Sequence, residues 1–78
     1  MTEIRIVWCK PCGYLPRTKE LENNLKKTFG NKISIESVPG EHGIFDVFVD
    51  DKLIFSKWKE RRFPEFEEIK TLVETRIK

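Results

Sequence analysis

The only two cysteines of this 78-residue chain, Cys9 and Cys12, are three positions apart. A chain of this size buries only about 60% of the surface that its unfolded form exposes, so a long-range disulfide would reinforce it usefully. A bridge between Cys9 and Cys12 would close a very short loop, and the entropic stabilisation from a disulfide grows with the length of that loop. The fold must therefore be held together by a hydrophobic core, and the cysteines are a poor structural staple.

Composition and charge predict a single globular domain over residues 1–78. The chain has 15 basic and 13 acidic residues, a net charge of +2, and 38% hydrophobic residues, which fits a folded chain rather than a disordered one. This balance implies no nucleic-acid partner, and no apolar stretch is long enough to span a membrane. Glu3 and Arg5 interrupt the first residues, so we expect no secretory signal and a cytoplasmic location. In that compartment, Cys-x-x-Cys pairs are more often catalytic, redox-sensing or metal-binding than structural.

Short β-branched and aromatic runs predict four strands, of which the first is moderately buried on both faces. They cover Ile4–Trp8, Ile33–Val38, Ile44–Val49 and Lys52–Lys57. Asp50 and Asp51 separate the last two strands and suit a tight hairpin.

Apolar residues at helical spacing predict two helices. The first extends from about Gly13 to Phe29, with Gly13 as its N-cap and Pro16 in its first turn. The second extends from Pro64 to Ile77, with Pro64 at its first helical position.

The predicted order of elements is β-α-β-β-β-α, an α+β fold of the thioredoxin-like type. The first strand, helix and second strand should form a right-handed parallel unit, and the following hairpin should add antiparallel strands to give a four-stranded mixed sheet. Each helix has one apolar stripe, so both helices should pack on the sheet as an α/β sandwich. Cys9 and Cys12 then lie between the end of the first strand and the start of the first helix.

Such a junction favours thiol chemistry. The thiolate is the nucleophile in disulfide exchange, and a helix N-terminus lowers the pKa of a nearby cysteine because its free N–H groups favour the anion. Lys10 places a cation between the two sulfurs, and Pro11 restricts the backbone of the spacer. Gly13, as the predicted N-cap, would support the same geometry.

Other roles for the cysteines fit less well. Zinc needs about four ligands, and beyond Cys9 and Cys12 the chain offers a single histidine, His42. We therefore expect no metal within one chain, and His42 is interpreted as a solvated loop residue. Two inert buried cysteines are disfavoured by their position between a strand end and a proline-containing turn.

Two further features stand near these motifs. Trp8 precedes Cys9, and we expect it to be partly core and also to contact partners. A local basic cluster comprises Lys57, Lys59, Arg61 and Arg62. Nearby glutamates offset this cluster, which favours a solvated face over a phosphate-binding one.

Four separate motifs of the chain together resemble the Rdx family, the group related to selenoproteins W, T and H. They are C-K-P-C-G-Y at 9–14, G-I-F-D-V at 43–47, L-I-F-S-K at 53–57 and R-F-P-E at 62–65. The resemblance covers almost the whole chain. It implies a thioredoxin-like fold and a thiol-based redox role, with an antioxidant function linked to glutathione or thioredoxin.

The resemblance leaves the attacking cysteine open. In selenoprotein W the selenocysteine occupies the position matched by Cys12, which implies attack by Cys12. In thioredoxins, which Trp8–Cys12 also resembles, the first cysteine attacks. Thioredoxins also place a cis-proline before a central strand, whereas His42 and Gly43 precede Ile44–Val49 here. This departure argues against general protein-disulfide reductase activity of the thioredoxin kind.

We therefore expect a small thiol–disulfide oxidoreductase or redox-responsive protein that cycles between a Cys9–Cys12 disulfide and a dithiol. Its partner would be a protein or a low-molecular-weight thiol or disulfide, with no cofactor beyond an external reductant such as glutathione or a thioredoxin system. The alternative is a non-enzymatic interaction module under redox control. The sequence does not define the substrate or the oligomeric state.

Overall fold

The first strand carries the alternation on which the sheet is built. In the computed structural model, which describes residues 2–77, β1 extends over Thr2–Cys9. Ile4, Ile6 and Trp8 point into the core, whereas Arg5 and Val7 on the opposite face are half-buried. The prediction of moderate burial on both faces is therefore corrected to one fully buried face, because the long helices cover that face alone.

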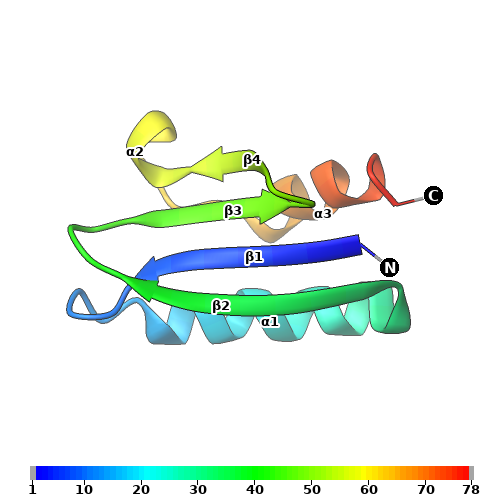
Figure 1. The fold of residues 1–78 in the computed structure, drawn as a ribbon, viewed down its shortest axis with the longest axis horizontal. Helices are drawn as coiled ribbons and strands as arrows, with labels where there is room; N and C mark the ends of the chain where they lie inside the picture. The colour runs from blue at the N-terminus through cyan, green and yellow to red at the C-terminus, as the bar shows by residue number, and fades with distance from the viewer. Residues whose placement is uncertain (1, 78) are drawn as a thin grey trace.

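The four strands form one mixed sheet with the order β2-β1-β3-β4 (Figure 1). β2 (Ile33–Gly40) is parallel to β1, β3 (Phe45–Val49) is antiparallel to β1, and β4 (Lys52–Ser56) is antiparallel to β3. Asp50 and Asp51 connect β3 to β4 with φ angles of 49° and 69°, the left-handed conformation of a tight hairpin turn. The predicted mixed sheet is thus confirmed.

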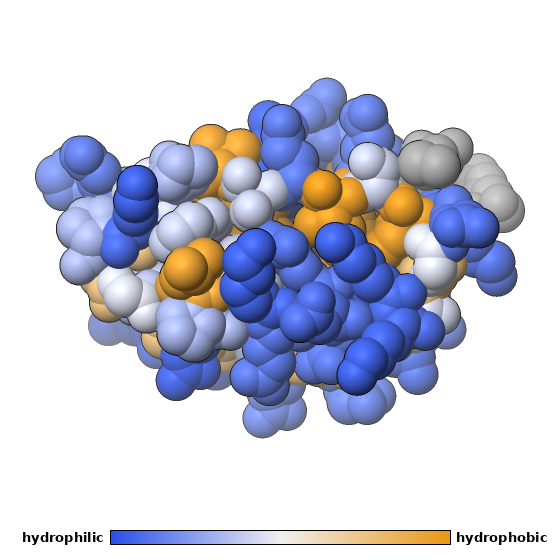
Figure 2. Space-filling model, turned by 90° about the horizontal axis from the view of Figure 1, so that it is seen from below, coloured by the Kyte–Doolittle hydropathy of each residue, from blue (hydrophilic) through white to orange (hydrophobic). Residues whose placement is uncertain are grey.

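Two long helices cover the same face of the sheet, behind it in Figure 1. α1 extends over Leu15–Phe29 and is followed by a 3₁₀ turn, η1, at Gly30–Lys32. α3 extends over Phe66–Glu74. The outer surface on the side of α1 and β2 is mainly hydrophilic, with hydrophobic groups in small separate areas (Figure 2). Each helix therefore buries one stripe and presents charged residues to solvent, as predicted.

One core joins the sheet to both helices. It contains Ile4, Ile6, Trp8, Leu21, Leu25, Ile33, Phe45, Val47, Val49, Phe55, Ile69 and Val73. These residues come from all four strands and from α1 and α3, so the α+β, thioredoxin-like sandwich is confirmed.

The helix starts differ from their predicted positions. Tyr14, not Gly13, is the N-cap of α1, although Pro16 still lies in the first turn. Pro64 precedes α3, whose N-cap is Glu65. For α3 the physical reason is tertiary packing. The ring of Phe63 lies 5.4 Å from the ring of Phe45, so Phe63 holds the residues before α3 against the sheet.

The ends of β4 and α3 also differ from their predicted positions, and the helix α2 was not predicted. The last strand stops at Ser56, because Lys57–Glu60 forms a short helix, α2, that ends at Arg61 in the left-handed conformation (φ 60°). α3 ends at Glu74 rather than Ile77, and its last turn continues as hydrogen bonds from the N–H groups of Arg76 and Ile77 to the carbonyl of Val73.

A bidentate ion pair fixes the segment before α3. Arg62 donates from Nη1 to Oε1 of Glu68 at 3.0 Å and from Nη2 to Oε2 at 2.6 Å. The guanidinium also lies 5.4 Å from the ring centre of Phe55. The hydrogen bond from Arg62 lowers the pKa of Glu68 below its usual value of 4.5. Because both groups are partly solvated, the stabilisation is modest.

This pair predicts a pH-dependent part of the stability. A lowered folded-state pKa means that the contribution of Glu68 is present above its unfolded-state pKa and is lost as pH falls through the lowered value. Glu68→Gln should therefore destabilise the protein more at neutral pH than at a pH well below the usual carboxyl range, where Glu68 becomes protonated. Urea unfolding at both pH values measures this, and an equal destabilisation at both would contradict it.

The core makes a second prediction. Ile6 is fully buried in the central strand, so Ile6→Val should lower the free energy of unfolding by about 0.5–1.5 kcal/mol. Leu53 is 49% exposed, and Leu53→Ala removes more atoms but should cost less than about 0.5 kcal/mol. Urea denaturation of both variants checks the contrast, which would disappear if the two sites were equally packed.

Candidate functional site

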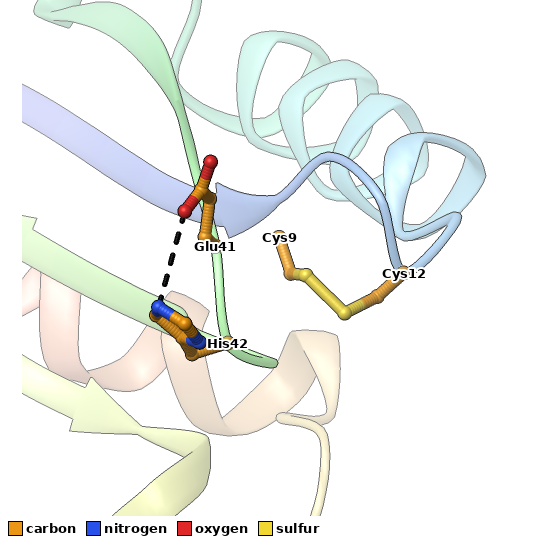
Figure 3. The surroundings of a disulfide bond; sticks show 4 residues. All are labelled: Cys9, Cys12, Glu41 and His42. Atoms are coloured by element: carbon orange, nitrogen blue, oxygen red, sulfur yellow. Dashed lines mark ion pairs between the residues drawn. A yellow bond between two sulfur atoms is a disulfide. The ribbon is translucent and has the colours of Figure 1, made fainter.

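A disulfide joins Cys9 and Cys12 at the end of β1 (Figure 3). Cys9 is the last residue of the strand, and α1 begins at Leu15, so the residues between them form the turn that carries Cys12. The two Cα atoms are 5.3 Å apart. The predicted position between a strand end and a helix start is confirmed.

The two sulfur-bearing residues differ in exposure. Cys9 is 0% exposed, whereas Cys12 lies on the surface. The pairing of Cys9 with Gly40 on β2 fixes Cys9 within the sheet, while Cys12 lies beyond the last ladder pair. An external thiol or disulfide therefore has access to Cys12 and not to Cys9.

Backbone hydrogen bonds hold the turn. The N–H of Lys10 donates to the carbonyl of Gly40 at 3.1 Å, and the N–H of Gly13 donates to the carbonyl of Lys10 at 3.2 Å. Gly13 has a φ of 77°, a conformation that other residues adopt only with strain. The first bond ties the cysteine turn to the end of β2, and the second closes the turn itself.

An aromatic cluster fixes the start of α1. The ring of Tyr14 makes edge-to-face contacts with Phe45 at 6.3 Å and with Phe63 at 4.8 Å between ring centres. Its carbonyl accepts hydrogen bonds from both the N–H and the hydroxyl of Thr18. Tyr14 thus anchors the chain two residues after Cys12.

The predicted supporting residues fall into two groups. Lys10, Pro11 and Gly13 are exposed in the cysteine turn. Trp8 is only 8% exposed and lies in the core, which confirms its structural part. The expected contact of Trp8 with partners needs correction, because burial of its indole leaves little surface for one.

The loop between β2 and β3 lies beside the cysteine turn (Figure 3). The side chain of His42 in this loop is 90% exposed, and its Nε2 lies 3.9 Å from the carboxylate of Glu41. His42 is therefore a solvated loop residue, as expected. Within residues 2–77 every peptide bond is trans, and no group of three or more potential metal ligands is present.

One exposed residue near this end was not assigned a role from the sequence. Trp58 of α2 is 64% exposed. A β-carbon built on Gly43 would lie 4.0 Å from Trp58 Cζ2 and 3.9 Å from Tyr14 Oη, so Trp58 and Tyr14 both lie beside Gly43. Trp58 lies outside every predicted apolar stripe, and this was the signal in the sequence that could have pointed to its exposure.

Comparison with known proteins agrees with this geometry. The model of the Rdx family matches residues 3–75. The chain is 38% identical to sheep selenoprotein W over 56 residues, which cover 69% of this chain and 64% of that protein. It is 36% identical to mouse migration and invasion enhancer 1 over 61 residues, 78% of this chain and 52% of that protein. The chain thus spans about half to two thirds of the length of these relatives.

Solved structures extend the likeness to the whole fold. A selenoprotein W-related protein from Vibrio cholerae superposes with a TM-score of 0.93 at 28% identity, covering 99% of this chain and 98% of that one. A protein from Bordetella parapertussis gives a TM-score of 0.94 at 26% identity, covering 97% and 98%.

The fold and the cysteine turn define a small thioredoxin-like protein with a Cys-x-x-Cys motif at a strand–helix junction. Within that class, the chain belongs to the Rdx family. Among its described residues, no helix has the length and apolar character needed to cross a membrane.

The difference in exposure predicts unequal reactivity after reduction. In the folded dithiol, iodoacetamide should label Cys12 at least about tenfold faster than Cys9, because labelling of a buried thiol requires local opening. Peptide mass spectrometry after timed labelling measures both rates. Labelling in urea is the control and should abolish the difference, whereas equal rates in the folded protein would show that Cys9 is accessible.

Proposed function

We propose that this chain is a thiol–disulfide oxidoreductase that cycles between a Cys9–Cys12 disulfide and a dithiol. The observation that carries the proposal is the pairing of an exposed Cys12 with a buried Cys9 in one turn. A disulfide with one accessible sulfur can be opened by an external thiol, and the protected sulfur remains in place to close it again.

The reaction in the reducing direction has two steps. The Cys12 thiolate attacks one sulfur of a substrate disulfide, forms a mixed disulfide and releases the first substrate thiolate. The Cys9 thiolate then attacks Cys12 Sγ, forms the intramolecular disulfide and releases the second substrate thiolate. Two electrons pass from the protein to the substrate, and protons from the two cysteine thiols pass through solvent to the released thiolates.

Cys12 is assigned as the attacking residue because of its exposure. The position of the turn before α1 supports thiolate formation, since free N–H groups at a helix start favour an anion. Cys9 is suited to resolve the mixed disulfide, because its partner sulfur is already within bonding reach and the step is intramolecular. The match of Cys12 to the selenocysteine of selenoprotein W favours the same order.

The redox cycle needs a supply of electrons from outside the chain. We assign this role to an external reductant, glutathione or a thioredoxin system, in the cytoplasm, with no bound cofactor or metal. The turn itself occupies the surface, which lets a reductant approach Cys12 without entering a cavity.

A second candidate function is a redox-controlled interaction module. The exposed indole of Trp58 beside Tyr14 and Gly43 favours it, because exposed tryptophans are enriched at binding surfaces. Such a module would capture a partner without turnover. A coupled assay with glutathione, glutathione reductase and a small disulfide separates the two, since catalysis above the uncatalysed rate is expected only of the oxidoreductase.

Single-cysteine variants test the proposed order. Reduced wild-type protein mixed with bis(2-hydroxyethyl) disulfide should end as the Cys9–Cys12 disulfide with two thiols released. Cys9→Ser should accumulate a mixed disulfide on Cys12, because the resolving thiolate is missing. Cys12→Ser should form its adduct at least about tenfold more slowly, because Cys9 is buried.

Intact-protein mass spectrometry measures these products, and circular dichroism controls for folding. Equal rates of adduct formation in the two variants would refute the order of attack. A folded wild-type protein that forms neither adduct nor disulfide would refute the redox function as a whole.

A further inference from the structure

The helix α2 lies at the same end of the sheet as the cysteine turn. In Figure 1, α2, the turn after β1 and the loop between β2 and β3 all lie at the left end of the molecule, where β1, β2 and β4 finish. α2 presents Trp58, which is 64% exposed. A large apolar side chain left in solvent beside a reactive turn calls for a role that the core does not explain.

Contacts connect Trp58 to the cysteine turn through one glycine. The place of a β-carbon on Gly43 is 4.0 Å from Trp58 Cζ2 and 3.9 Å from Tyr14 Oη. Tyr14 in turn follows Cys12 by two residues. Because Gly43 has no side chain, this position adds no bulk between the phenol of Tyr14 and the indole of Trp58. We call Tyr14, Gly43, Lys57 and Trp58 the Trp58 surface.

Positive charge accompanies this surface. Lys57 Nζ lies 5.9 Å from the ring centre of Tyr14 and 5.4 Å from that of Phe63, so it rests over aromatic faces rather than against a carboxylate. The ion pairs within residues 2–77 are Arg5–Asp51, Glu41–His42 and Arg62–Glu68. Lys57 and Lys10 take part in none of them. These ammonium groups are therefore available to carboxylates of a partner.

The loop between β2 and β3 explains why side chains would supply recognition. His42 and Gly43 stand where thioredoxins have a cis-proline, and the peptide bonds here are trans. This position therefore lacks the cis-proline with which thioredoxins hold the extended backbone of a substrate. Neighbouring side chains can supply selectivity instead. Besides the exposed Glu41 and His42 of the loop, the Trp58 surface offers aromatic and cationic groups near the turn.

We propose that the Trp58 surface selects an acidic polypeptide segment that flanks the reacting cysteine of a protein substrate. The indole of Trp58 packs against the segment, and Lys57 and Lys10 pair with its carboxylates. A ligand that contacts both Cys12 and Trp58 must extend across Tyr14 and Gly43, which favours a polypeptide over a small disulfide. The inference rests on the proposed exchange reaction and names its substrate class.

The chemistry is the two-step exchange at Cys12, with the partner's own disulfide as the oxidant. Each turnover breaks the partner's S–S bond, releases two partner thiols and leaves the Cys9–Cys12 disulfide. The Trp58 surface touches the partner rather than the reacting sulfurs. Its residues are specificity-determining and should act on the rate of association.

The test uses three synthetic peptide disulfides that differ only in charge. Each is a symmetric dimer of a short peptide with one cysteine, flanked by glutamates, glutamines or lysines. Reduced protein should react with the acidic peptide about threefold to tenfold faster than with the neutral one at low salt, and slowest with the basic one. The preference should shrink at high salt, because ions screen exposed charges.

Variants assign the preference to the surface. Lys57→Gln should remove most of the acidic preference, and Trp58→Ala should slow the acidic and neutral peptides alike by about threefold or more. Lys32→Gln and Leu53→Ala are matched controls, because both residues are exposed and lie at the other end of the sheet. Stopped reactions analysed by mass spectrometry give the rates.

Two results would overturn the inference, and they differ from failure of the exchange reaction. Equal rates with the three peptides at low salt would refute charge selection. An acidic preference that Lys57→Gln leaves intact, or rates that Trp58→Ala leaves unchanged, would refute the role of the Trp58 surface. In both cases exchange with bis(2-hydroxyethyl) disulfide still proceeds, whereas failure of the proposed function would abolish that reaction too.

Discussion

The central strand β1 is the constraint on which the rest of the structure depends. It pairs with β2 on one side and β3 on the other, and it buries Ile4, Ile6 and Trp8 beneath the helices. Because its last ladder partner is Gly40, the strand carries Cys9 into the sheet before the chain turns outward. The same pairing that builds the core therefore determines which sulfur is buried.

The turn after β1 determines how far each of the two cysteines is exposed. One hydrogen bond ties Lys10 to Gly40, and the aromatic packing of Tyr14 fixes the chain beyond Cys12. Between these two anchors, Cys12 is presented to solvent while Cys9 stays covered. The backbone position alone therefore leaves one sulfur-bearing residue exposed and the other buried.

Much of this structure could be predicted from local patterns in the sequence. Short β-branched and aromatic runs predicted the strands, Asp50–Asp51 predicted the hairpin, and the resemblance of four motifs predicted the family. The remainder depended on contacts between distant segments. Trp8 lies in the core because the helices cover its face. Phe63 packs on Phe45 just before Pro64, and Trp58 of α2 lies beside Gly43, which is distant from it in the sequence. No local pattern encodes such long-range contacts.

The reduction potential of the Cys9–Cys12 pair tests the central claim most directly. The folded protein would be equilibrated in glutathione and dithiothreitol redox buffers, trapped by alkylation and analysed by mass spectrometry. The account predicts a reversible two-electron transition with a midpoint between about −180 and −320 mV, the range in which cellular thiol systems exchange electrons. A pair that stays fully disulfide-bonded below that range, or fully reduced above it, while the fold is intact would contradict the proposed cycle.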